Sequence, residues 1–139
     1  MIKRELSCKR IGDVGADGEK GSKGSATFVA STATEDRYSD IIAQEGWELS
    51  SYRKNPVILF NHDSRALPIG KGEVEVVDGQ LLLEVEFDMD DPLAERISRK
   101  VDNGFINAVS VGFNPISSTL RNELPAEHRY YGENGKYFD

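Results

Sequence analysis

The sequence predicts a mainly β fold, an antiparallel β-barrel or half-barrel of about six or seven strands with helical decoration. Three observations support this class. Runs rich in β-branched and aromatic residues recur along the chain, a two-residue turn separates two alternating runs, and one segment has a helical period. The length of 139 residues is that of one ordinary domain, so residues 1–139 are treated as a single domain.

The first elements surround a glycine-rich segment. Residues 2–10 have a weak strand pattern, and residues 12–25 carry a glycine at every third position, which predicts a mobile loop. Residues 26–32 predict a better strand because they are rich in β-branched and aromatic side chains. A polar loop follows over residues 34–40.

The next predicted strand leads to a histidine. Residues 41–50 are expected to form a short helix or turn, with Trp47 and Leu49 facing inward. Residues 57–60 are a continuous apolar run, which predicts a strand buried on both faces. This strand would place His62 at its end.

A β-hairpin is the clearest local signal. Asp78 and Gly79 are the pair favoured in two-residue type I′ turns, and the runs on either side alternate between apolar and polar residues. The turn pairs Val76 with Leu81, which sets the register. The apolar face of the hairpin then consists of Val74, Val76, Leu81, Leu83, Val85 and Phe87.

One helix is expected after the hairpin. Asp90 or Asp91 can cap its start, and Pro92 suits its first position. Asn103 and Gly104 can close it. Its core stripe consists of Leu93, Ile97 and Val101.

Two β elements are predicted in the remaining sequence. Residues 105–116 have the pattern of a strand and contain Ser110. Residues 130–131 and 137–138 flank a turn with two glycines, which predicts a second hairpin.

Composition excludes several function classes. Lys and Arg number 17 and Asp and Glu 24, and the net charge of −7 argues against general binding to nucleic acid or anionic membranes. The single cysteine, Cys8, excludes an intrachain disulfide and a cysteine-based zinc site. Asp88, Asp90 and Asp91 lack the Gly and Glu of an EF-hand loop and are interpreted as a helix cap and a solvated turn. The sequence therefore predicts a soluble intracellular protein without a metal or cofactor.

Two side chains are candidates for nucleophilic catalysis. An imidazole held at a strand end, as predicted for His62, suits a general base at neutral pH. By strand alternation, Ser110 shares a face with Ala108 and Gly112, whose small size leaves space for a substrate backbone. Neighbouring strands would bring this serine within hydrogen-bond reach of the histidine. Each residue taken alone also fits a structural role, in which it hydrogen-bonds only its surroundings.

Six segments, in order, resemble the HK97-type prohead protease family of tailed phages and prophages, which is distantly similar to the herpesvirus assemblins. The segments are Phe-Val-Ala-Ser-Thr at 28–32, Asp-Arg-Tyr-Ser-Asp-Ile-Ile at 36–42, Trp-Glu-Leu at 47–49 running into Asn-Pro-Val-Ile-Leu-Phe-Asn-His-Asp at 55–63, Pro-Ile-Gly at 68–70, the Asp-Gly hairpin at 78–79 and Ala-Val-Ser-Val-Gly-Phe at 108–113.

The resemblance implies a serine endopeptidase with an assemblin-like β fold. The family serine matches Ser110, the nucleophile, and the family histidine matches His62, the general base. Family members usually carry an acidic third residue on a later strand, and no matching segment precedes Asp139, so the domain is expected to lack its C-terminal part. The assemblins instead use a second histidine after the serine, which makes His128 a candidate orienting residue.

The resemblance also implies partners and a place of action. Family members cut the scaffold part of the major capsid protein precursor, and often themselves, inside the assembling prohead in the host cytoplasm, and a homo-oligomer is compatible with this role. The alternative is a non-catalytic β-barrel module that binds or scaffolds capsid protein. The pair of His62 and Ser110 favours the protease, and the missing acidic segment favours the module.

Overall fold

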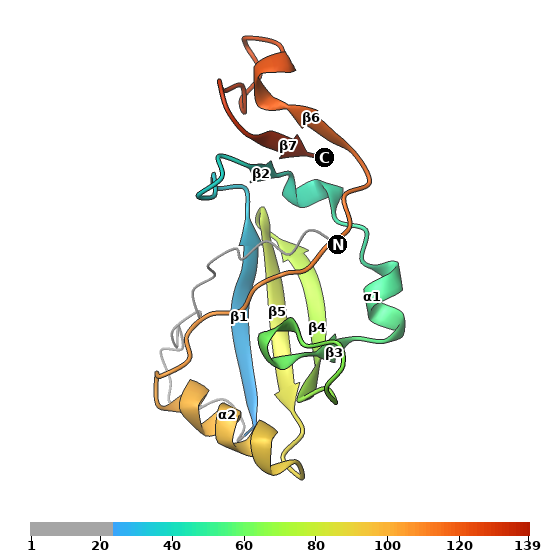
Figure 1. The fold of residues 1–139 in the computed structure, drawn as a ribbon, viewed down its shortest axis with the longest axis vertical. Helices are drawn as coiled ribbons and strands as arrows, with labels where there is room; N and C mark the ends of the chain where they lie inside the picture. The colour runs from blue at the N-terminus through green and yellow to red at the C-terminus, as the bar shows by residue number, and fades with distance from the viewer. Residues whose placement is uncertain (1–23) are drawn as a thin grey trace.

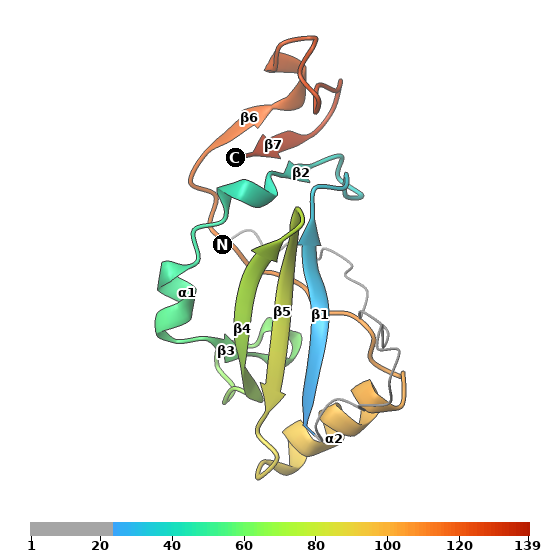
Figure 2. The same cartoon turned by 180° about the vertical axis from the view of Figure 1, so that it is seen from behind.

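Residues 24–139 are described by the computed structural model, in which seven strands form two sheets (Figures 1 and 2). The larger sheet is antiparallel, curls into a half-barrel and has the order β1 (Ser25–Thr32), β5 (Gln80–Phe87), β4 (Gly70–Val77) and β3 (Val57–Ile58). The smaller sheet has the order β2 (Ile41–Ile42), β7 (Lys136–Phe138) and β6 (Ser118–Leu120), with β2 and β7 parallel. The mainly β half-barrel prediction is confirmed.

Within the same range, short helices connect the strands. They are η1 (Gln44–Gly46), α1 (Ser50–Lys54), η2 (Phe60–His62), α2 (Pro92–Asp102) and η3 (Arg121–Glu123), where η marks a 3₁₀ helix. None of these helices has the length and apolarity needed to cross a membrane. The strand predicted at residues 2–10, Cys8 and most of the loop predicted at residues 12–25 lie outside the described residues, and Ser25 at the end of that loop already begins β1.

The predicted hairpin is confirmed as β4 and β5. Asp78 and Gly79 have φ angles of 49° and 72°, the positive values that both central residues of a type I′ turn require. In the resulting register Val76 lies opposite Leu81, as the turn predicted.

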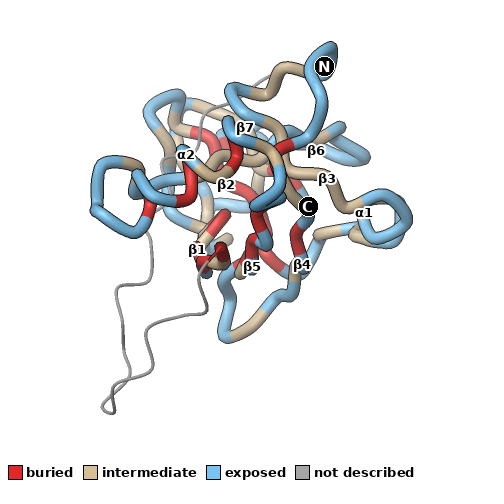
Figure 3. The backbone as a smooth tube through the Cα atoms, turned by 90° about the horizontal axis from the view of Figure 1, so that it is seen from below, coloured by how far each residue is buried: buried red, intermediate tan, exposed pale blue. Residues whose placement is uncertain are grey.

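The core lies on one face of the larger sheet, where Figure 3 shows buried stretches along β1 and β5. Every second residue of β5 from Leu81 to Phe87 is buried, because alternate side chains of a strand share a face. Phe28 of β1 is buried opposite Leu83. Val76 was predicted to be buried but is 37% exposed, because it lies next to the hairpin turn, at the end of the strand.

The helix α2 closes one end of this core. Asp91 caps it by accepting a hydrogen bond from the backbone N–H of Leu93 at 2.9 Å, with Pro92 at the first position. Ile97 and Val101 are buried as predicted, whereas Leu93 is 38% exposed. The buried face runs through Ala94 and Ser98 instead, so the first turn of the stripe was placed one residue too early.

We expect Leu83→Ala to lower the free energy of unfolding by about 2–5 kcal/mol, because the truncation leaves a cavity in the packed core. Unfolding in urea measures this loss. Val76→Ala on the neighbouring strand is the control, and we expect it to cost less because that side chain is more exposed. A loss below about 0.5 kcal/mol for Leu83→Ala, the range of surface substitutions, would show that the hairpin face is wrong.

Three predicted elements differ from the structure. The run at residues 57–60 forms only the two-residue strand β3, which pairs on one side with β4, so it is an edge strand and Phe60 is 42% exposed. Residues 105–116 cross one face of the larger sheet as an irregular segment with a single β-bridge, at Gly112 (Figures 1 and 2). Residues 130–131 form no strand, and β7 pairs with β6 and β2 instead.

Candidate active site

His62 lies in a loop that leaves and rejoins the larger sheet. Residues 59–68 form this loop, which is closed at its base by a hydrogen bond of 2.9 Å from the backbone N–H of Ile69 to the carbonyl of Ile58. Asn61 and His62 both have a φ of 53°, in the left-handed region that costs a non-glycine residue free energy. Two consecutive residues in this conformation turn the backbone sharply and hold the half-buried imidazole at the end of η2.

Ser110 lies in the irregular segment at residues 105–116, where side chains still alternate between two sides. Val109 and Val111 pack against the core of the larger sheet. Ala108 and Gly112 are exposed, and Ser110 between them is half-buried. The strand that the sequence predicts is absent, but the alternation that placed the serine beside two small residues is retained.

The structure brings His62 and Ser110 together. The strands that were predicted to carry them do not form at these two residues. The Nε2 atom of His62 and the Oγ atom of Ser110 form a hydrogen bond across 48 positions of sequence. A hydroxyl that donates to a neutral imidazole can transfer its proton to that ring as the oxygen attacks an electrophile. The pair has the geometry of a nucleophile with its general base.

The second ring nitrogen of His62 lies near Gly112. A Cβ atom added at this glycine would lie 3.9 Å from Nδ1. Within residues 24–139, no carboxylate hydrogen-bonds to the ring. The adjacent Asp63 turns away, and its Oδ1 atom accepts a hydrogen bond of 3.0 Å from the backbone N–H of Arg65.

His128 is not brought to the pair. It lies between β6 and β7, where its Nδ1 atom accepts a hydrogen bond of 3.1 Å from the backbone N–H of Tyr130. Its ring contacts that of Tyr137 edge to face at 5.3 Å. These contacts give the imidazole a structural role in the smaller sheet. His128 follows Ser110 in sequence, but it does not lie beside Ser110 in the structure.

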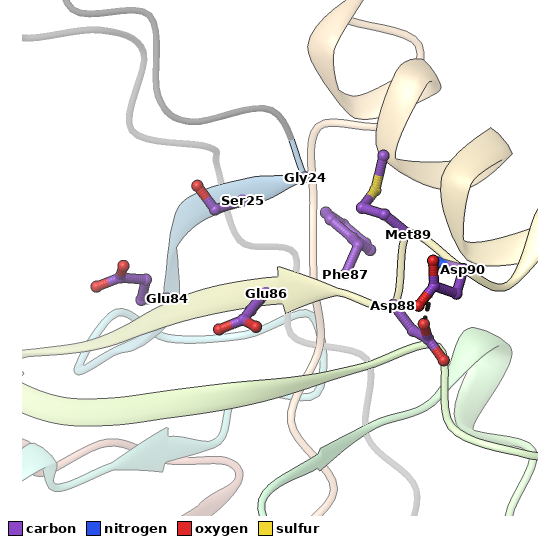
Figure 4. Close-up of a pocket in the computed structure, with 8 residues that line it drawn as sticks. All are labelled: Gly24, Ser25, Glu84, Glu86, Phe87, Asp88, Met89 and Asp90. Carbon is purple, nitrogen blue, oxygen red and sulfur yellow. Dashed lines mark hydrogen bonds between the residues drawn. The ribbon is translucent and has the colours of Figure 1, made fainter.

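An acidic pocket lies elsewhere, at the end of the larger sheet next to α2 (Figure 4). Glu84, Glu86, Asp88 and Asp90 line it together with Phe87. The Oδ1 atom of Asp88 accepts a hydrogen bond of 3.2 Å from the backbone N–H of Asp90. These two acidic residues therefore form a local turn, as predicted. Over the described range, no group of three metal-ligating side chains converges here or at any other place.

Three aromatic residues contact one another next to the segment that carries Ser110, and the sequence did not place them at the site. The ring of Phe113 contacts the rings of Trp47 and Phe138 edge to face, at 5.7 and 5.5 Å. The alternation of Val109, Val111 and Phe113 could have indicated this packing, because three apolar residues on the side opposite the serine are expected to contact other apolar side chains.

The chain is similar to a known phage protein. The chain is 35% identical over 88 residues to the prohead protease of Escherichia phage T5. The match covers 60% of this chain and 41% of the phage protein, so the chain corresponds to less than half of that relative. No family model and no solved structure matches the chain.

Proposed function

We propose that this chain, which is related to the phage prohead proteases, is the part of a serine endopeptidase that carries the nucleophile and the general base. The 35% identity to the prohead protease of Escherichia phage T5 supports the resemblance that the six sequence segments indicated. The hydrogen bond between Ser110 Oγ and His62 Nε2 is the observation on which the proposed mechanism rests. The proposed substrates are scaffold segments of the major capsid protein precursor, and the protease itself.

In the proposed reaction, Ser110 Oγ attacks the carbonyl carbon of the scissile peptide bond while His62 Nε2 takes the hydroxyl proton. The protonated imidazole then gives this proton to the leaving amine nitrogen, the C–N bond breaks, and an acyl-enzyme remains. A water molecule, deprotonated by the same nitrogen, attacks the ester carbonyl and releases the acid product and the free serine.

The surroundings of Ser110 suit an extended peptide substrate. Ala108 and Gly112 are exposed and present little or no side chain beside the hydroxyl. A peptide backbone can therefore approach the serine from the side opposite the core. The proposed place of action is the inside of the assembling prohead in the host cytoplasm.

A non-catalytic module that binds capsid protein is the second candidate. The observation that favours it is the imidazole of His62, whose Nδ1 atom has no hydrogen-bond acceptor among residues 24–139. A serine protease needs such an acceptor to fix the tautomer of the ring and to stabilise its protonated form. The protease therefore requires a group from outside the described residues.

Co-expression with capsid precursor separates the two candidates. We expect the full-length protein to convert the precursor to a shorter product, seen by intact mass, and Ser110→Ala to leave the precursor intact. The module predicts that precursor and protein co-purify without a change in the precursor's mass, for the wild type and the variant alike. That result would contradict the proposed activity.

A further inference from the structure

Side-chain packing holds the nucleophile in place. Among residues 24–139, the segment from 107 to 117 has one β-bridge, at Gly112, and joins no strand of either sheet. Val109 and Val111 pack against the core, and the hydrophobic effect that favours this packing has no preferred direction. A contact with a preferred geometry is needed to fix the position of Ser110 relative to His62.

The ring of Phe113, three residues after Ser110, supplies such a contact. It lies between two aromatic rings and meets them at interplanar angles of 82° for Trp47 and 83° for Phe138. Edge-to-face pairs have a preferred geometry, in contrast to aliphatic packing. Two of them on one ring therefore hold the segment in both position and orientation.

Trp47 is itself fixed by a buried polar network. Its Nε1 atom donates a hydrogen bond of 3.0 Å to the Oε1 atom of Gln44. The side-chain amide of this glutamine donates to Ser31 Oγ of β1 at 3.0 Å and to the carbonyl of Ile42 at 3.1 Å. Both Gln44 and Ser31 are buried, so the network ties one of the two rings to the larger sheet.

Phe138 is fixed by the smaller sheet. It belongs to β7, the central strand, and lies opposite Ile42 in the parallel pairing with β2. Its carbonyl accepts a hydrogen bond of 2.7 Å from the backbone N–H of Ala43, and its side chain is buried. The second ring therefore depends on the docking of β7 against β2.

We infer that Phe113 is a positioning residue, which acts through the backbone to hold Ser110 against His62 and couples the nucleophile to the docking of β7 in the smaller sheet. This inference rests on the proposed function, because it concerns the same hydrogen-bonded pair. Displacement of a nucleophile by about 1 Å can cost about 100-fold in rate, so a loosened ring contact affects catalysis more than substrate binding.

The test compares Phe113→Leu with Phe105→Leu, the same substitution at a 78% exposed position of the same segment. In the full-length protein, we expect Phe113→Leu to lower kcat for a capsid-derived peptide by about 10–100-fold with little change in KM. The rate at which a fluorophosphonate labels Ser110 should fall in parallel. Phe105→Leu should leave both rates unchanged, and Phe113→Tyr, which keeps the ring, should restore most of the activity.

Leu83→Ala controls for a general loss of stability, because Leu83 belongs to the core and takes part in neither of the two ring contacts of Phe113. Where Phe113→Leu does not fold, Phe138→Leu removes one of the two ring contacts from the other side and takes its place in the comparison. A wild-type kcat for these ring variants, or an equal loss in Leu83→Ala, would overturn the positioning role while Ser110→Ala remains inactive. Cleavage by Ser110→Ala at the wild-type rate would instead refute the proposed function itself.

Discussion

Ser110→Ala should reduce the cleavage of capsid precursor by about 10⁴–10⁶-fold, and His62→Ala should be about as damaging. The hydroxyl is a poor nucleophile unless a base accepts its proton, and the imidazole has no catalytic use without the hydroxyl to which it is hydrogen-bonded. The rate of precursor cleavage by the full-length protein, followed by gel densitometry or intact mass, gives both losses.

The double variant distinguishes a functional pair from two separate contributions. Because the two side chains act as one unit, Ser110→Ala combined with His62→Ala should be no slower than either single variant. His128→Ala is the matched control, since it removes a histidine whose contacts lie in the smaller sheet. A loss in His128→Ala as large as that in His62→Ala would contradict the assignment of the base.

Arg121→Met should lower the free energy of unfolding by at least about 3 kcal/mol, because it removes several charge-assisted hydrogen bonds from a buried site. Arg121 is 8% exposed, and its guanidinium donates to three carbonyls, those of Ser39 at 2.8 Å, Tyr130 at 3.0 Å and Asn134 at 3.4 Å. It also forms an ion pair of 3.0 Å with Glu35. These contacts join the loop before β2 to the turn before β7.

Urea unfolding of Arg121→Met beside Arg96→Met, an exposed arginine on α2, measures this loss. We expect the control to change stability by less than about 0.5 kcal/mol, as for surface substitutions. Arg121→Lys keeps the charge but not the planar fork of donors, so it should recover only part of the stability. Equal losses for the two methionine variants would show that the buried guanidinium does not hold the smaller sheet together.

The same site gives a direction for the pH dependence. Hydrogen bonds from Ser39 and Arg121, together with the arginine's charge, hold the pKa of Glu35 below its usual range. A lowered carboxylate pKa adds stability above the ordinary glutamate pKa, and this stability is lost as the pH falls through the lowered value. Arg121→Met should therefore show a smaller loss of stability on acidification than the wild type.

The hairpin of β4 and β5 and the helix α2 were predicted correctly, because residues close together in sequence determine both. The hairpin follows from two residues that adopt positive φ angles, and α2 follows from the cap at Asp91 and the proline after it. The register of β4 and β5 was correct because a slip of one residue would turn the whole apolar face to solvent.

The arrangement around the site could not be read from such signals. Residues 105–116 alternate like a strand, but within the described part of the chain they join neither sheet, and Val109 and Val111 pack against the core of the larger sheet. β7 was expected to pair with the residues just before its turn, yet it inserts between β6 and β2, where Phe138 pairs with Ile42, 96 positions away in sequence. The side chains of His62 and Ser110 are hydrogen-bonded, as expected, but their surroundings depend on these long-range contacts.

The most direct test of the proposed mechanism is the site at which a fluorophosphonate modifies the full-length protein, mapped by mass spectrometry of its peptides. This reagent reacts with a serine oxygen that a neighbouring base has activated. The proposed mechanism predicts one major adduct, on Ser110, that disappears in His62→Ala and persists in His128→Ala. Two results would contradict the mechanism. One is an adduct on another serine. The other is a reagent that inhibits the cleavage of capsid precursor while Ser110 stays unmodified.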